Sequence, residues 1–181
     1  MGVTLRCACR PQAELQPARL ADGLHALQCA ACGGVLLSLP EYRVWQERLP
    51  TAPVLPAKAL DADETDSGAR SCPACTRLMQ RHRVGATPDF RIDRCVPCQQ
   101  VWFDRDEWAA LVAAGLATRL PEVLSETWQR QLRNNELRQR REQTLRERHG
   151  DDCIDELLRM RRFLDLHPQR DELLALLRAG W

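Results

Sequence analysis

Nine cysteines in a chain of 181 residues constrain what this sequence can fold into more than any other feature. Eight of them form four close pairs, and the pairs group into two quartets. The quartets are Cys7, Cys9, Cys29 and Cys32, followed by Cys72, Cys75, Cys95 and Cys98. In both quartets the second and third cysteines are 20 positions apart. Two short turns that each supply two thiolates, brought together by a hairpin, can surround one metal ion.

The quartets belong to an internal repeat with an offset of 66 positions. The offset superposes the third and fourth cysteines of the two quartets, and it places Leu36 on Trp102. Repeat one covers residues 5–48 and repeat two covers residues 71–114. Self-similarity of this kind predicts two modules with the same fold.

Metal ligation explains the quartets better than disulfides or free core thiols do. The first residues, MGVTLRCACR, lack the apolar run of a secretory signal, and we expect a cytoplasmic protein. In that reducing compartment paired cysteines are more often metal ligands than disulfides. We predict one structural Zn²⁺ per quartet, two ions in all, because four thiolates leave no open coordination position. A rubredoxin-like iron centre uses the same ligands and remains the alternative.

The two quartets differ in one detail. Cys7 and Cys9 are separated by a single residue, whereas the other three pairs have two residues between the cysteines. A one-residue spacer can still chelate a metal, but the first turn of repeat one must then differ in shape.

Local signals predict three strands in each repeat. Asp22-Gly23 predicts a hairpin in repeat one, with positive φ at both central residues. In repeat two we expect strands at residues 78–84 and 90–94 around a turn at 85–88. A third strand is expected at residues 35–39 and at 101–103. Asp104 and Glu107 then match a capping box for a helix over residues 105–114, which Gly115 closes.

The remaining chain differs in composition from the repeats. Residues 49–70 contain three prolines and four acidic residues without apolar periodicity, which predicts a solvated tether. From Pro121 onward the apolar spacing is helical. Gly150 ends a long helix, residues 152–165 form a second, and Pro168 begins a third. We expect the last two to form a helical hairpin that buries its leucines, and the unpaired Cys153 to be a buried apolar residue.

Arginines dominate the long helix and form the candidate surface for nucleic acid or a protein partner. They are Arg130, Arg133, Arg138, Arg140, Arg141, Arg146 and Arg148. Three glutamates interrupt them, and a solvated, salt-bridged helix is the alternative interpretation. The formal net charge of the whole chain is only +1, which gives no global attraction to nucleic acid or to a membrane.

Repeat two resembles the bacterial transcription-factor-IIB-type zinc ribbon family. The residues that match its pattern are Cys72, Pro73, Cys75, Cys95, Cys98, Val101, Trp102, Phe103, Asp104 and Glu107. Gln99 and Gln100 depart from the Gly-Gly often seen after the last cysteine, and Gly33-Gly34 restores it in repeat one. The resemblance implies two tandem zinc ribbons without an enzymatic site, with Trp102 and Phe103 as core residues beside the metal.

Together these features predict a small α+β protein, with two antiparallel zinc-ribbon modules followed by an α-helical C-terminal region. The expected parts are residues 1–48, 49–70, 71–116 and 117–181, namely ribbon, linker, ribbon and helical tail. We expect a non-catalytic adaptor or regulator, transcription-related, that binds a protein partner or nucleic acid but no membrane. Self-association as a homodimer through the tail is the structural alternative, and iron redox chemistry is a third.

Overall fold

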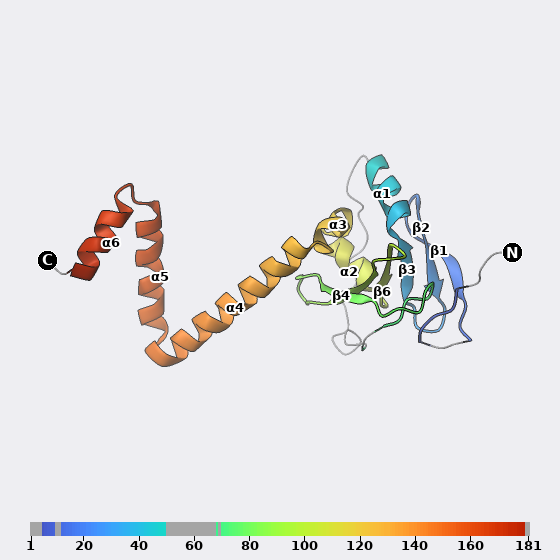
Figure 1. Ribbon diagram of the computed structural model, residues 1–181, viewed down its shortest axis with the longest axis horizontal. Helices are drawn as coiled ribbons and strands as arrows, with labels where there is room; N and C mark the ends of the chain where they lie inside the picture. Colours follow the sequence, from blue (N-terminus) through green and yellow to red (C-terminus); the bar gives the residue numbers. More distant parts are fainter. Residues whose placement is uncertain (1–4, 10–11, 50–67, 69, 180–181) are drawn as a thin grey trace. The chain divides into compact units, whose positions relative to one another are not determined.

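The computed structural model describes residues 5–9, 12–49, 68 and 70–179 (Figure 1). The linker predicted for residues 49–70 therefore lies outside the described residues, apart from positions 49, 68 and 70. The chain divides into two compact units, Met1–Leu132 and Arg133–Trp181, which are described separately below.

The two repeats share one sheet. Its strands are β1 Leu15–Ala21, β2 Leu24–Cys29, β3 Val35–Ser38, β4 Gln80–Arg83, β5 Arg91–Cys95 and β6 Gln100–Phe103. They form a six-stranded antiparallel sheet in the order β1-β2-β3-β6-β5-β4. Each repeat contributes three neighbouring strands, and the third strands pair at the centre (Figure 1). The expected strands are present, but their union into one sheet was not predicted.

The hairpin predicted at Asp22-Gly23 joins β1 to β2. Of the two turn residues only Gly23 has a positive φ, of 73°, whereas a positive φ was predicted at both. The register shifts between Arg19 and Ala21, so an irregularity in β1 compensates for the different turn.

The central pairing of β3 with β6 follows a local two-fold relationship. Leu36 pairs with Trp102, and Val35 pairs with Phe103. The repeat offset makes Leu36 and Trp102 equivalent positions, so each repeat presents the same position of its third strand to the other. An antiparallel pair of equivalent strands is the arrangement in which both modules bury the same edge.

Side chains alternate between the two faces of this central pair. Val35, Leu37, Val101 and Phe103 belong to a large core beneath the helices that follow the third strands. Leu36 and Trp102 belong instead to a second core, which contains cysteines of both quartets. One face of the sheet is therefore covered by helices and the other carries the cysteines.

Each third strand continues into a helix, α1 Leu39–Arg48 in repeat one and α2 Glu107–Ala113 in repeat two. Helix α1 was not predicted from the sequence, although Pro40 occupies its first turn and the repeat offset places Tyr42 on Trp108. Tyr42 is fully buried and donates a hydrogen bond of 2.7 Å to the carbonyl of Ala117, which follows α2. Helix α1 thus joins repeat one to the chain that follows repeat two.

The helix expected over residues 105–114 begins later, at Glu107, after Asp106 with a φ of 65°. Asp104 does not cap it with its side chain, because that carboxylate accepts a 2.8 Å hydrogen bond from the Trp102 indole and pairs with Arg70. Half of the predicted capping box forms, since the Glu107 carboxylate accepts the Asp104 N–H at 2.7 Å.

A short 3₁₀ turn, Ala117–Arg119, and α3, Leu120–Val123, lead into α4, Glu126–His149. The first turn of α4 is fixed to the end of β4. The Trp128 indole donates to the Val84 carbonyl at 3.1 Å. The Gln129 amide accepts from the Arg83 N–H at 3.0 Å and donates to the Arg83 carbonyl at 2.8 Å.

The second unit contains most of α4, then α5, Asp151–Leu166, and α6, Arg170–Ala179. The expectation of a hairpin that buries its leucines is wrong for most of them, because in α5 and α6 only Ile154 and Leu164 are buried. The expectation for Cys153 is also wrong, since its side chain is exposed and the neighbouring Ile154 takes the buried position. Among the described residues, no helix combines the length and apolar character needed to cross a bilayer.

Candidate metal centres

Three of the four cysteine pairs form the same kind of turn. In the Cys29, Cys72 and Cys95 turns, the residue after the second cysteine has a positive φ: 75° at Gly33, 61° at Thr76 and 51° at Gln99. In the first of these turns the Gly33 N–H donates to the Cys29 carbonyl at 2.8 Å, and in the second the Thr76 N–H donates to the Cys72 carbonyl, also at 2.8 Å. Such turns aim two sulfur atoms at a common point, as a chelating pair requires.

The turns of each repeat converge into one sulfur cluster. In each quartet all four Sγ atoms lie within 4.8 Å of one another. The Sγ–Sγ distances are 3.6 Å for Cys7–Cys32, 3.7 Å for Cys9–Cys29 and 3.6 Å for Cys75–Cys95. A tetrahedron with metal–sulfur bonds of about 2.3 Å has edges of about 3.8 Å. The sulfurs are therefore spaced for a tetrahedral metal ion.

The same distances do not fit disulfides. A disulfide bond is about 2.05 Å long, and all the described cysteines are free thiols. The shorter spacing between Cys7 and Cys9 does not prevent the four sulfurs of repeat one from clustering. The Cys9 sulfur lies close to the Cys29 sulfur, and the Cys9 N–H points at the Cys7 sulfur at 3.4 Å. Two groups of four cysteines are thus positioned to hold two metal ions.

Burial and backbone dipoles act in opposite directions on the thiols. Burial raises the pKa of Cys7 and Cys72, and it raises the pKa of Cys32 to about 11. Backbone hydrogen bonding from Arg77, followed by contact with Cys98, lowers the pKa of Cys75 to about 7. At Cys29 the effect of burial is outweighed by the N–H groups of Cys32 and Ala31, and the pKa falls to about 7. Each quartet therefore contains a thiol whose pKa is lowered toward neutral pH.

The two quartets share one apolar wall. Cys7 and Cys29 of the first quartet, and Cys72 and Cys95 of the second, belong to the same buried cluster as Leu36 and Trp102. Leu15 and Met79 complete its buried core. Trp102 is fully buried. The wall between the two candidate metal centres is therefore built from both repeats.

Several charged side chains that were not predicted from the sequence lie around Trp102. The Arg70 guanidinium lies 4.9 Å from the centre of the Trp102 ring and pairs with Asp104 and, at 3.8 Å, with Asp93. Burial raises the pKa of Asp93 to about 6, although Arg81 and Arg70 oppose that shift. The only sequence signal was Asp104, which was assigned to a helix cap. These contacts hold the indole in place rather than offering carboxylates to a metal.

The candidate arginines of the tail lie along α4 and, apart from the partly buried Arg146, are exposed. Arg140 pairs with Glu136 at 2.6 Å, and Arg146 pairs with Glu142 and Asp155, both at 2.8 Å. The structure thus supports salt bridging for these two. The other five lie on the same helix.

Comparison with family models, with curated proteins and with solved structures finds no match for this chain. The resemblance to the transcription-factor-IIB-type zinc ribbon therefore rests on the residues of the sequence alone.

Proposed function

We propose that this chain is a non-catalytic, zinc-binding adaptor or regulator with two zinc ribbons joined in one sheet, acting in a reducing compartment such as the cytoplasm. The observation that carries the proposal is the pair of cysteine quartets, each with its four Sγ atoms within 4.8 Å. Thiolates are favoured ligands of zinc in structural sites. A shell of four protein thiolates has no position for a substrate, so the metal supports the fold rather than a reaction.

Zinc binding would supply folding free energy to a part of the molecule that needs it. In the described residues, the cysteine-bearing face has a small core of eight buried side chains, four of them cysteines. Without metal, those four thiols would be buried as weak hydrogen-bonding groups. Metal binding to such modules contributes on the order of 10 kcal/mol or more.

The first experiment is metal analysis of the purified chain. We expect two zinc ions per chain and no visible absorption, because zinc has a filled d shell. A coloured protein containing iron in equal amount would replace the zinc proposal with the rubredoxin-like alternative. Fewer than one metal ion per chain, in protein purified under reducing conditions, would contradict both.

Two surfaces support a binding role. Val96 lies within the second cysteine turn of repeat two, and Leu78 lies just after the first turn. Leu78 has 67% and Val96 has 45% of its surface exposed. Apolar side chains held out on a metal-stabilised turn are suited to contact a protein partner. Their positions in repeat one are occupied by Gln12 and Ala30, so this surface belongs to the second ribbon alone.

The second surface is the basic face of α4, which favours nucleic acid. At 100° per residue its arginines span about 160° of the helix circumference, and the interrupting glutamates lie outside that arc. The arginines on this face are Arg130, Arg133, Arg138, Arg140, Arg141 and Arg148. An extended row of guanidinium groups is suited to backbone phosphates. Together with the ribbon resemblance, this supports a transcription-related role.

The adaptor role is tested by purifying the tagged chain from its own cells with and without nuclease, and identifying the partners by mass spectrometry. The matched variant carries Leu78→Ser and Val96→Ser, and its zinc content should remain two. Partners lost in this variant identify a protein contact at the ribbon. Partners lost only with nuclease identify nucleic acid as the bridge. A chain that retains its zinc but captures nothing specific in either case would contradict the adaptor proposal.

A further inference from the structure

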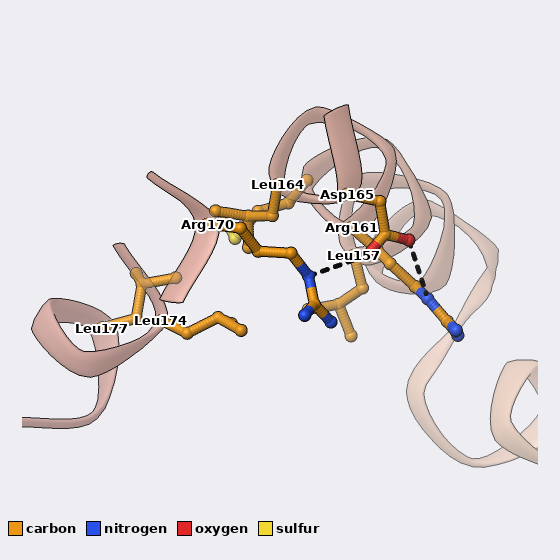
Figure 2. A pocket seen from close by; sticks show the side chains of 8 residues that line it. Leu157, Arg161, Leu164, Asp165, Arg170, Leu174 and Leu177 are labelled. Atoms are coloured by element: carbon orange, nitrogen blue, oxygen red, sulfur yellow. Dashed lines mark hydrogen bonds and ion pairs between the residues drawn. The ribbon is translucent and has the colours of Figure 1, made fainter. Parts of the chain in front are cut away.

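The hairpin of α5 and α6 leaves more of its large apolar side chains exposed than buried. Six of its large apolar side chains are exposed, and two of these, Leu157 and Leu177, retain 55% and 56% of their surface. Leu157, Leu164, Leu174 and Leu177 line an open groove of about 390 Å³ between the two helices (Figure 2). Arg161 and Arg170 both reach Asp165 at one rim of the groove, at 3.6 and 3.2 Å.

Two helices cannot cover such a surface by themselves. Each amphipathic helix must bury its apolar face against another element. Only Ile154 and Leu164 are buried in the hairpin. A second pair of helices laid over the groove would complete a four-helix bundle.

The charge distribution of α5 identifies the second pair. Its first six residues contain four acidic side chains and no basic ones, whereas residues 159–162 contain three arginines. Two copies of α5 packed antiparallel would set the acidic half of each against the basic half of the other. Parallel packing would instead set like charges together. A helix with this pattern is complementary to itself about a two-fold axis near Leu157.

We propose that the α5–α6 face binds the same face of a second copy of this chain, forming an antiparallel four-helix bundle. Leu157, Met160, Leu174 and Leu177 fill the interface. Some of the charges already pair within one copy, such as Arg159 with Glu156 at 2.6 Å. The Arg159–Glu156 pair is exposed and contributes little stability, so it can exchange for a pair across the interface, whereas Asp151 and Asp155 also pair with the partly buried Arg146 of α4. The dimer would present the sheet unit in two copies.

The proposal is tested by sedimentation equilibrium of the full chain over a range of concentrations. We expect a mass of about 41 kDa, twice the 20.7 kDa of one chain. Leu157→Glu with Leu177→Glu should raise the dimer dissociation constant at least ~10-fold, because the charges would be buried in the interface. Both leucines are half-exposed in a single copy, so the monomer should still fold. Leu137→Glu, on the exposed side of α4, is the control and should leave the mass unchanged.

Charge exchange tests the antiparallel arrangement and separates a second copy from a different partner. A chain with Asp152→Arg and Glu156→Arg has five basic and three acidic side chains in α5, and one with Arg159→Glu and Arg162→Glu has one basic and seven acidic side chains there. Each alone should dissociate, and an equal mixture should restore the dimer mass as a heterodimer. Wild type that remains monomeric at every concentration, or a mixture that remains monomeric, overturns the proposal. Zinc content is unaffected in either case, so the metal proposal is judged separately.

Discussion

Leu36 and Trp102 lie directly opposite each other across the β3–β6 pair, at equivalent positions of the two repeats, and both side chains pack among the cysteines. A leucine and a tryptophan thus form one cross-strand pair on the local two-fold axis. Cross-strand pairs of large apolar side chains are what stabilise a sheet beyond its backbone hydrogen bonds. Because this pair contacts the cores of both candidate metal centres, the stability of one centre should depend on the other.

The first prediction concerns this dependence. Cys95→Ser opens the second sulfur cluster, and we expect the zinc content to fall from two ions to one. The remaining quartet should also bind zinc at least ~10-fold more weakly, because the shared wall loses its support in repeat two. Elemental analysis and titration with a competing chelator measure both effects.

Cys153→Ser is the matched control for that variant. Cys153 is exposed and outside both quartets, so its replacement should leave two zinc ions bound with unchanged affinity. Full metal content in Cys95→Ser would show that the ligand assignment is wrong. An unchanged affinity at the remaining site would show that the repeats fold independently.

The second prediction concerns Gly34. A Cβ atom at this position would overlap the six-membered ring of Trp102, and the indole is held by Asp104 and Arg70. Gly34→Ala should therefore destabilise the fold by about 1–3 kcal/mol, as overpacking of a core does. Chemical denaturation in the presence of zinc measures the change in the free energy of unfolding.

Rescue distinguishes overlap with the ring from a backbone effect. In a Trp102→Leu background, which copies the residue of repeat one, Gly34→Ala should cost much less than in wild type. Gly68→Ala is the control, since no atom of the residues that the structure describes lies within 4 Å of its Cβ position. Equal costs of Gly34→Ala in both backgrounds would remove the ring as the cause.

The Gly34–Trp102 contact also explains why repeat two has a glutamine where repeat one has Gly34. The repeat offset places Gln100 on Gly34 and Leu36 on Trp102. The large ring belongs only to repeat two, so glycine is required only in repeat one. The resemblance indicated the missing glycine, but its cause depends on the pairing between the repeats.

Local signals predicted the strands and the grouping of cysteines, because turn residues and ligand spacing act within a few residues of one another. The joining of β3 to β6 could not be predicted in this way. The offset shows that Leu36 and Trp102 are equivalent, and equivalent positions can lie in separate modules or opposite each other. The choice depends on burial of two strand edges that no short segment contains.

The errors have similar physical causes. Asp104 was assigned to a helix cap because sequence spacing does not reveal that Trp102 and Arg70 compete for its carboxylate. The leucines of α5 and α6 were expected to bury one another, but apolar residues are spread around α5 from Leu157 to Phe163, more widely than one helix can cover. Cys153 was judged from its apolar neighbours, and only Ile154 faces inward.

The third prediction is a pH dependence of stability. Glu107 is buried, and burial raises the pKa of its carboxyl to about 8, an effect that the Asp104 N–H opposes and the nearby Asp104 and Asp93 carboxylates reinforce. The folded state therefore holds a proton that the unfolded chain releases near pH 4.5, and stability falls as the pH rises from about 5 to 8. Glu107→Gln cannot ionise, so the advantage of wild type over this variant should shrink by roughly 2 kcal/mol between pH 5 and 7.

Denaturation of both proteins with saturating zinc at each pH measures this difference and cancels the shared contribution of the thiols. Glu41→Gln is the control, because the repeat offset places Glu41 on Glu107 but its side chain is exposed. Its pH profile should follow that of wild type. A constant difference between wild type and Glu107→Gln from pH 5 to 8 would show that Glu107 is ionised throughout.

The last prediction concerns the basic face of α4. We expect weaker binding to a DNA duplex of arbitrary sequence when Arg138→Ala, Arg140→Ala and Arg141→Ala are combined. The plot of log K against log salt should also become less steep, with the magnitude of its negative slope reduced by about 2–3. Fluorescence anisotropy at several salt concentrations measures both. The control removes the same charge from exposed arginines of the sheet unit, with Arg19→Ala, Arg43→Ala and Arg48→Ala. If the control lowers the slope as much as the α4 variant does, net charge rather than the α4 face governs binding, and an unchanged slope in the α4 variant excludes that helix from the phosphate contacts.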